Sequence, residues 1–305
     1  MPAKSKARLR DIGEFGLIHT VAKLVRKTKG TIKGIGDDCA VLKSPGGKDL
    51  LLTTDMLAED VHFKVSHSAR AIGYKAMACS VSDIAAMGGV PRAAVVSLGV
   101  PADLRIEFVK NLYRGMNILA NKFHFNIVGG DTIAFRKIII NVTLLGVAKK
   151  EDIVYRAGAK KGDYIFTTGA LGRSFATKKH LSFMPRLGQA QYLVKDFKPT
   201  AMIDVSDGLA GDLGHILKAS KAGAVIYEKL IPKTKGATTK DALYDGEDFE
   251  LIFTLPPFEG RRLIQTKAQY PFYYIGNIVD KREGFVLLTA KGKREIIPKE
   301  SFTHF

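Results

Sequence analysis

The sequence predicts an α/β protein of two domains, and three observations lead to this prediction. The chain has 305 residues, enough for two domains of ordinary size, each with a core of its own. Hydrophobic residues make up 46% of it and charged residues 25%, which is the composition of a globular protein. Strand-like runs alternate with helical runs, and the alternation starts again after a Lys-rich, Gly-punctuated connection over 149–162. We therefore expect an N-terminal domain over 1–149 and a C-terminal domain over 150–305.

Apolar periodicity separates strands from helices in the N-terminal domain. Short apolar runs predict strands at residues 50–54, 93–100 and 138–148. Longer runs with apolar residues at helical spacing predict helices at 69–87 and 106–123. Strand and helix therefore alternate through this half of the chain.

The same alternation describes the C-terminal domain. Strands are predicted at residues 164–168, 202–205, 251–255 and 273–279. Helices are predicted at 169–180 and 209–220. Pro185 and Gly188 interrupt an otherwise helical pattern over 185–198, so the type of that segment stays open.

Composition excludes several classes of protein. No run approaches the roughly 20 apolar residues that span a bilayer, and the basic start of the chain, 1–10, has no apolar core behind it. We therefore expect a cytoplasmic protein without membrane contact. Cys39 and Cys79 are the only cysteines, too few for a disulfide framework or a thiolate zinc site, so buried free thiols are expected.

The net charge of +17 raises the question of nucleic-acid binding. The basic residues are spread through short clusters, without zinc-finger spacing or an aromatic RNA-binding signature. This distribution favours a solvated basic surface and no specific nucleic-acid partner. Incidental binding of polyanions remains the alternative.

Aspartates in this lysine-rich chain follow strand-like runs or lie beside glycine, where α/β proteins build their sites. Five motifs contain them: Gly34-Ile35-Gly36-Asp37-Asp38, Thr53-Thr54-Asp55, Val81-Ser82-Asp83, Gly129-Gly130-Asp131-Thr132 and Asp204-Val205-Ser206-Asp207-Gly208. Each alone could be a turn or a helix cap. Together their carboxylates would repel one another unless cations neutralised them. Asp212, on the helix that follows, is interpreted as a solvated residue.

Magnesium with a nucleoside triphosphate suits these motifs. Mg²⁺ prefers hard oxygen ligands, which carboxylates, hydroxyls and phosphates supply. Glycines beside the acids allow backbone N–H groups to approach phosphate closely, as at Gly129 and Gly130. The chain has no phosphate-binding P-loop, no protein-kinase motif set and no dinucleotide fingerprint, so ATP would be bound in another way.

The order and spacing of these motifs resemble the thiamine-monophosphate kinase family, part of the superfamily of aminoimidazole ribonucleotide synthetase and selenophosphate synthetase. Three further elements favour the kinase within that superfamily: Gly13-Glu14-Phe15, Val61-His62-Phe63 and Gly246-Glu247-Asp248-Phe249-Glu250-Leu251. The resemblance covers the chain from about Gly13 to Phe305. It implies the two-domain architecture of that superfamily and a homodimer in which the sheets of two N-terminal domains pair.

The resemblance also implies a set of site residues. The metal ligands would be Asp38, Thr53, Thr54, Asp55, Asp83, Asp131, Asp204 and Asp207, with Asp55, Asp83 and Asp131 acting in catalysis. ATP would contact Gly130, Asp131, Arg156, Ser206 and either Tyr113 or Arg114. The phosphorylated thiamine would contact His62, Glu247 and Phe302.

Three of these residues have ordinary structural explanations beside the functional one. The planar guanidinium of Arg156 suits a bidentate phosphate contact, but it could be a surface arginine of the connection. His62 lies between apolar residues and could be a satisfied core histidine. Glu247 could offer its carboxylate to the cationic thiazolium or the aminopyrimidine, or be a turn residue.

The activity that the resemblance implies is direct, in-line transfer of the γ-phosphoryl group of ATP to thiamine monophosphate. The acceptor is already a phosphate oxygen, so positioning and charge neutralisation would carry the reaction. Two rival hypotheses are another ATP-using enzyme like aminoimidazole ribonucleotide synthetase, and a basic nucleic-acid-binding protein whose acidic motifs are only turns.

Overall fold

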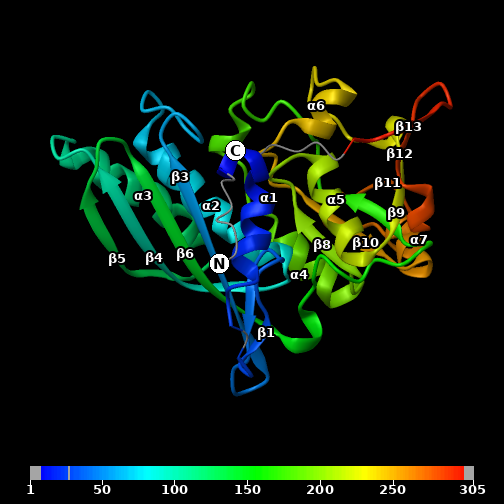
Figure 1. Ribbon diagram of the computed structural model, residues 1–305, viewed down its shortest axis with the longest axis horizontal. Coiled ribbons are helices and arrows are strands. Elements are labelled where there is room, and N and C mark those ends of the chain that lie inside the picture. Colours follow the sequence, from blue (N-terminus) through cyan, green and yellow to red (C-terminus); the bar gives the residue numbers. More distant parts are fainter. Residues whose placement is uncertain (1–7, 27, 299–305) are drawn as a thin grey trace, which may run out of the picture.

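The computed structural model describes residues 8–26 and 28–298, which form two mixed sheets side by side (Figure 1). The first sheet contains β1 (Thr31–Lys33), β2 (Ala40–Leu42), β3 (Lys48–Ala58), β4 (Val90–Val100), β5 (Asn126–Ala134) and β6 (Ile139–Lys149). Its strand order is β1-β2-β3-β6-β4-β5, which leaves β5 at an edge. Only β4 and β5 pair in parallel.

The second sheet has the order β13-β12-β9-β11-β7-β10-β8. Its strands are β7 (Tyr164–Thr167), β8 (Ala201–Asp204), β9 (Gly223–Tyr227), β10 (Leu251–Leu255), β11 (Tyr273–Val279), β12 (Phe285–Leu288) and β13 (Arg294–Ile296). Because the first sheet ends at Lys149 and the second begins at Tyr164, the two sheets support the division near residue 150. That boundary itself stays a prediction.

Seven α-helices lie around the sheets within the described residues. They are α1 (Leu9–Ala22), α2 (Ala69–Ala86), α3 (Ile106–Lys122), α4 (Leu187–Asp196), α5 (Leu209–Ser220), α6 (Thr239–Tyr244) and α7 (Pro257–Gln265). Short 3-10 turns cover Lys150–Asp152, Lys179–Leu181, Glu228–Leu230 and Lys281–Glu283. In the described part of the chain, none of the helices combines the length and apolar character needed to cross a membrane.

Helix α2 is buried along most of its length and carries side chains to both halves of the molecule. The Ser68 hydroxyl caps its start by accepting the Ala71 N–H. Its middle crosses α3 closely, because a Cβ at Gly73 would lie 2.0 Å from the Leu112 carbonyl oxygen and one at Gly115 would lie 1.9 Å from that of Arg70. Glycine at both positions therefore fixes how near these helices approach each other.

The helices α2 and α3 cover one face of the first sheet, while the other face is open to solvent in one chain. Apolar side chains such as Val96 and Val142 pack against the helices in the first core. On the opposite face Met56 is 61% and Ile133 58% exposed. An open apolar sheet face of this kind is typical of an interaction surface.

Most of the predicted elements are present. One segment that was left open contains a helix, and one predicted helix is absent. Residues 185–198, left open, contain α4 from Leu187. The helix predicted at 169–180 is wrong, because only the 3-10 turn at Lys179–Leu181 forms there. Gly172, Arg173 and Lys178 all have positive φ, which is incompatible with a continuous right-handed helix.

Candidate active site

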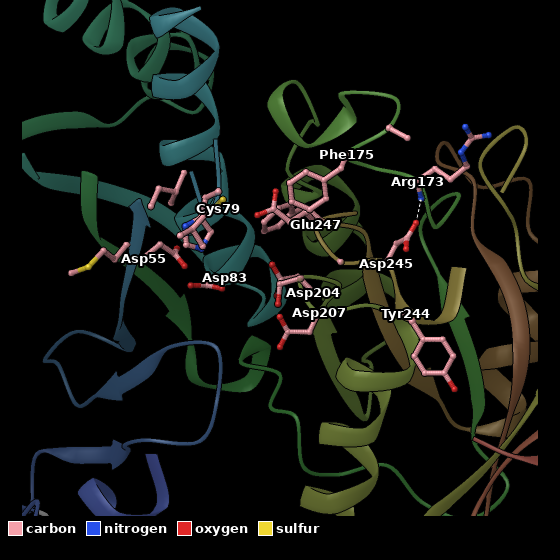
Figure 2. A pocket seen from close by; sticks show the side chains of 18 of the residues that line it. Asp55, Cys79, Asp83, Arg173, Phe175, Asp204, Asp207, Tyr244, Asp245 and Glu247 are labelled. Atoms are coloured by element: carbon pink, nitrogen blue, oxygen red, sulfur yellow. Dashed lines mark hydrogen bonds between the residues drawn. The ribbon is translucent and has the colours of Figure 1, made fainter. Parts of the chain in front are cut away.

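A cavity of about 690 Å³ lies where the two halves meet, and both contribute to its lining (Figure 2). Asp55 and Asp83 come from the first half and Asp204 and Asp207 from the second. Beside these acids the lining changes to Leu57, Val61, His62, Phe175 and Glu247. We call the part lined by the aspartates the acidic end, and the part lined by apolar side chains together with His62 and Glu247 the apolar end. This lining suits a ligand with a charged part and a ring.

Three carboxylates from distant segments converge at the acidic end. Asp38 precedes β2, Asp83 lies in the last turn of α2 and Asp204 ends β8. Each offers one oxygen, and these oxygens all lie within 4.8 Å of one another. We call Asp38, Asp83 and Asp204 the acidic cluster. Its members come from both halves, as the sequence predicted for the metal site.

Hydroxyl groups hold the acidic cluster and its neighbour Asp55 in place. The Ser82 hydroxyl donates to Asp204 Oδ2 at 2.5 Å, which joins α2 to the second sheet. The Thr53 hydroxyl donates to Asp83 Oδ2, and the Ser80 hydroxyl donates to Asp55 Oδ2 at 2.9 Å. These neutral donors orient the carboxylates without cancelling their charge.

The environment of these acids disfavours their ionised forms. Burial, together with the charges of Asp55 and Asp204, raises the pKa of Asp83 well above its usual range. Burial also raises the pKa of Asp55, and burial with the nearby Asp38 charge raises the pKa of Asp204 to about 8. A cation among them would favour the charged forms.

Asp38 shows where such a cation fits. Arg156 binds one of its oxygens, with Nη2 2.6 Å and Nε 3.3 Å from Oδ1. The other oxygen, Oδ2, is buried and has no hydrogen-bond partner. A buried acceptor without a donor is unfavourable, and Asp38 also has an oxygen within 4.8 Å of carboxylate oxygens of Asp83 and Asp204. This set of hard oxygen donors fits Mg²⁺.

Two of the predicted ligands lie on the opposite face of the first sheet. Thr54 donates to Asn141 and is within 3.0 Å of the Thr143 hydroxyl, both on β6. The register of the paired strands places Asp131 on β5 in line with the exposed Met56 on β3, across β4 and β6. Asp131 therefore lies on the same open face as Met56. Thr54 is among the residues that line the cavity, but neither side chain belongs to the acidic cluster in one chain, and their assignment stays a prediction.

The glycine before Asp131 has a structural reason. A Cβ at Gly130 would lie 1.8 Å from the Val96 carbonyl oxygen on the paired strand β4. Only glycine allows this approach. The structure therefore accounts for Gly130 by strand pairing, while its predicted contact with ATP stays a prediction.

The remaining predicted nucleotide residues fall into two groups. Ser206 lines the cavity in the loop between β8 and α5, next to Asp207, a predicted metal ligand that also lines it. Tyr113 is half-buried against the first core on α3, and Arg114 pairs with Glu107 on the same helix. Neither of these α3 residues lines the cavity.

The apolar end brings together two of the three predicted substrate residues, His62 and Glu247. Figure 2 shows Glu247 beside Phe175, with the acids next to them. Phe302 lies outside the described residues. Sequence reasoning missed Phe175, because the segment that carries it was predicted to be a helix.

The interpretation of Asp212 as a solvated residue is wrong. Asp212 is 2% exposed, and its Oδ2 accepts the backbone N–H of Asp207 at 2.9 Å. It thus supports the loop that carries Ser206 and Asp207. The sequence contained a signal for this burial. Asp212 lies three residues after Leu209 and four before Ile216, and both of these face the core, so Asp212 is on the buried side of the helix.

Family models and known proteins resemble the chain over nearly its whole length. Residues 36–148 match the N-terminal domain, and residues 130–289 the C-terminal domain, of AIR synthase related proteins. The thiamine-monophosphate kinase of Bacillus subtilis is 35% identical over 96% of this chain and 99% of its own length. That of Escherichia coli K12 is 32% identical over 96% and 98%.

A solved structure agrees with these relatives. The structure of AaThiL complexed with AMPPCP and TMP superposes with a TM-score of 0.86 at 31% identity, covering 99% of this chain and all of that one. The thiamine monophosphate kinase of Aquifex aeolicus gives a TM-score of 0.79 at 29% identity, covering 95% of this chain and 100% of that chain.

Proposed function

Because the chain belongs to the thiamine-monophosphate kinase family, we propose that it transfers the γ-phosphoryl group of ATP directly to thiamine monophosphate, giving thiamine diphosphate and ADP. It is an ATP-using phosphotransferase. In this proposal the triphosphate lies at the acidic end of the cavity and the thiamine rings lie at the apolar end.

The convergence of carboxylates from both halves in the acidic cluster supports the proposal most strongly. One oxygen of the cluster, Asp38 Oδ2, is buried without a hydrogen-bond partner. Repulsion among these buried acids would favour their separation unless a cation joined them. The hydroxyl of Ser82 nevertheless ties α2 to Asp204 across the two halves. The fold therefore maintains a place for positive charge where a triphosphate has access.

We propose that Asp38, Asp83 and Asp204 hold Mg²⁺, with Asp55 and Asp207 close by in the lining. Bound magnesium would neutralise negative charge on the phosphates during transfer. The number of ions and the parts of Thr53, Thr54 and Asp131 in binding them are proposals that rest on the family resemblance.

The chain's own residues orient the two anionic reactants. Arg156 already holds Asp38, and its guanidinium has further N–H groups for a phosphate oxygen. Ser206 lines the cavity two residues after Asp204 and would contact the nucleotide. His62 and Glu247 would fix the thiamine end. Since a phosphate oxygen is the nucleophile, the proposal needs no strong base, and alignment of the reactants supplies most of the rate.

Incubation with ATP, Mg²⁺ and thiamine monophosphate tests the activity. We expect mass spectrometry to detect thiamine diphosphate and ADP in equal amounts, and omission of Mg²⁺ to abolish both. Thiamine in place of its monophosphate serves as the control acceptor. Release of ADP without thiamine diphosphate would contradict the proposed acceptor.

We also propose that two chains pair through the open face of the first sheet. Apolar Leu52, Met56, Val95 and Ile133 are exposed on that face. Pairing would cover these side chains and would enclose Thr54 and Asp131, which lie on the same face. Size-exclusion chromatography with light scattering tests this, since a single species of monomer mass would count against it. The cytoplasmic location and the absence of a specific nucleic-acid partner stay predictions.

A further inference from the structure

We propose that Lys75 is a positioning residue that fixes Glu247 and the His62 turn at the apolar end of the cavity. The inference rests on the proposed function, because it assigns Lys75 to the binding of the thiamine substrate. It concerns a side chain that belongs neither to the acidic cluster nor to the cavity lining.

Lys75 projects from the middle of α2 and is fully buried, at 0% exposure. A buried ammonium group is unfavourable unless it is paired and hydrogen-bonded. Its Nζ donates to the His62 carbonyl oxygen at 2.7 Å and to Glu247 Oε2. It also lies 5.6 Å from the centre of the Phe175 ring, within range of a cation–π contact. All three partners line the cavity.

Glu247 is held in a conformation that its own chain disfavours. Its φ is 63°, a left-handed geometry that is unfavourable for a residue with a Cβ. Its N–H donates to the Ser206 carbonyl oxygen at 2.7 Å, and its carbonyl oxygen accepts the Ser174 hydroxyl at 2.6 Å. Contacts on both sides of the residue therefore determine where its carboxylate points.

Lys75 completes this arrangement from the other half of the molecule. Burial raises the pKa of Glu247, while the Lys75 ammonium acts in the opposite direction and favours the carboxylate. The same ammonium fixes the backbone at His62, whose ring Nδ1 accepts the Ala58 N–H. One buried cation thus sets the distance between the two predicted substrate residues. Loss of Lys75 would free both while leaving the acidic cluster unchanged.

Steady-state kinetics of Lys75→Met test this role. We expect the KM for thiamine monophosphate to rise at least about tenfold, with kcat and the KM for ATP within about threefold of wild type, because the ring end of the substrate loses binding energy while the acidic end still aligns the phosphates. Lys75→Arg, which keeps the charge, should recover part of the affinity. Lys198→Met is the matched control, because Lys198 also joins distant segments, by an exposed ion pair to Asp152 at 2.7 Å.

A double variant keeps the test valid if Lys75→Met leaves too little folded protein. Lys75→Met with Glu247→Gln removes both charges, so no unpaired carboxylate stays buried. If Lys75 acts through Glu247, the double variant should have a KM for thiamine monophosphate within about threefold of that of Glu247→Gln alone. A further rise of about tenfold or more over Glu247→Gln would overturn the assignment.

Hydrogen exchange measured by mass spectrometry separates this inference from the proposed function. In Lys75→Met, amides in 58–63 and 244–249 should exchange at least about fivefold faster than in wild type, and in Lys198→Met they should not. This readout needs no turnover, so it decides on Lys75 even if wild type fails to phosphorylate thiamine monophosphate. Unchanged exchange, or equal rises in KM for both substrates, would overturn the inference.

Discussion

Two groups of buried acids flank the cavity, and they are neutralised in different ways. In the acidic cluster, Asp38 has an ion pair with Arg156, whereas neither Asp83 nor Asp204 has one among the described residues. The second group, which we call the paired acids, consists of Asp248 and Glu250 in the loop that precedes β10. Both are ion-paired with Lys179, and Glu250 is also paired with Arg186.

The difference is visible when the proton affinity of Glu250 is compared with that of Asp83 and Asp204. Glu250 is 1% exposed, yet the cations beside it outweigh burial and lower its pKa. Burial at Asp83 and Asp204 is reinforced by like charges, and their pKa values rise. Buried carboxylates with fixed partners are structural, whereas those without cations depend on an ion from outside. The comparison therefore indicates a structural role for Glu250 and agrees with the proposal that the acidic cluster binds Mg²⁺.

Asp83→Asn should give the largest effect. We expect kcat/KM to fall by at least about a thousandfold, because a ligand of the proposed magnesium site is lost. The fold should be kept, since an amide can still accept the Thr53 hydroxyl and repulsion with Asp55 and Asp204 is removed. Mg²⁺ should raise the melting temperature of wild type and have a smaller effect on the variant.

A buried aspartate outside the cavity provides the control for that substitution. Asp163 is 2% exposed and accepts the Lys160 N–H and the Thr200 hydroxyl. Asp163→Asn should lower stability while keeping turnover per folded molecule and the response to Mg²⁺. Wild-type turnover by Asp83→Asn would show that Asp83 is not a ligand.

Glu250→Gln should be next in size and should affect stability first. Its carboxylate accepts from Arg186 at 2.5 and 2.6 Å, from Thr168 at 2.7 Å and from Lys179 at 3.0 Å. We expect the free energy of unfolding to fall by about 3 kcal/mol, because the two cations lose a buried partner but keep some access to water. Urea denaturation measures it. A change below about 1 kcal/mol would contradict a structural role for the pair.

The sequence was sufficient to select the three members of the acidic cluster as candidates but not to predict the faces of the first sheet. Asp38 could be selected because it ends a Gly-rich motif, Asp83 because it follows a serine, and Asp204 because it ends a strand-like run. Asp131 was assigned to the same site, although strand β5 places it on the open face. Which face a side chain takes depends on strand register, and register depends on partners far along the chain.

The segment around Phe175 shows a second limit of local reasoning. Its residues favour a helix by composition, but Gly172 donates its N–H to Asp248 at 2.6 Å, and that carboxylate lies 76 residues further along the chain. Lys179 and Arg186 then bind Glu250. A loop shaped by distant ion pairs leaves no periodic signal, so tertiary contacts overrode local propensity.

Asp248 gives the smallest expected effect and the most sensitive test of the comparison, because burial affects its pKa more strongly than its ion pair with Lys179 does. Its pKa is raised from 3.8 to about 6, mainly by burial and despite Lys179. The folded state therefore holds a proton that the unfolded state has released between about pH 4 and pH 6, and stability falls as pH rises through this window.

In Asp248→Asn that contribution is absent, while the amide oxygen can still accept the Gly172 N–H. Urea denaturation at pH 4, 5 and 6 should thus show wild type losing roughly 2 kcal/mol relative to the variant on going from pH 4 to pH 6. A constant difference would mean that Lys179 neutralises Asp248 as fully as it and Arg186 neutralise Glu250.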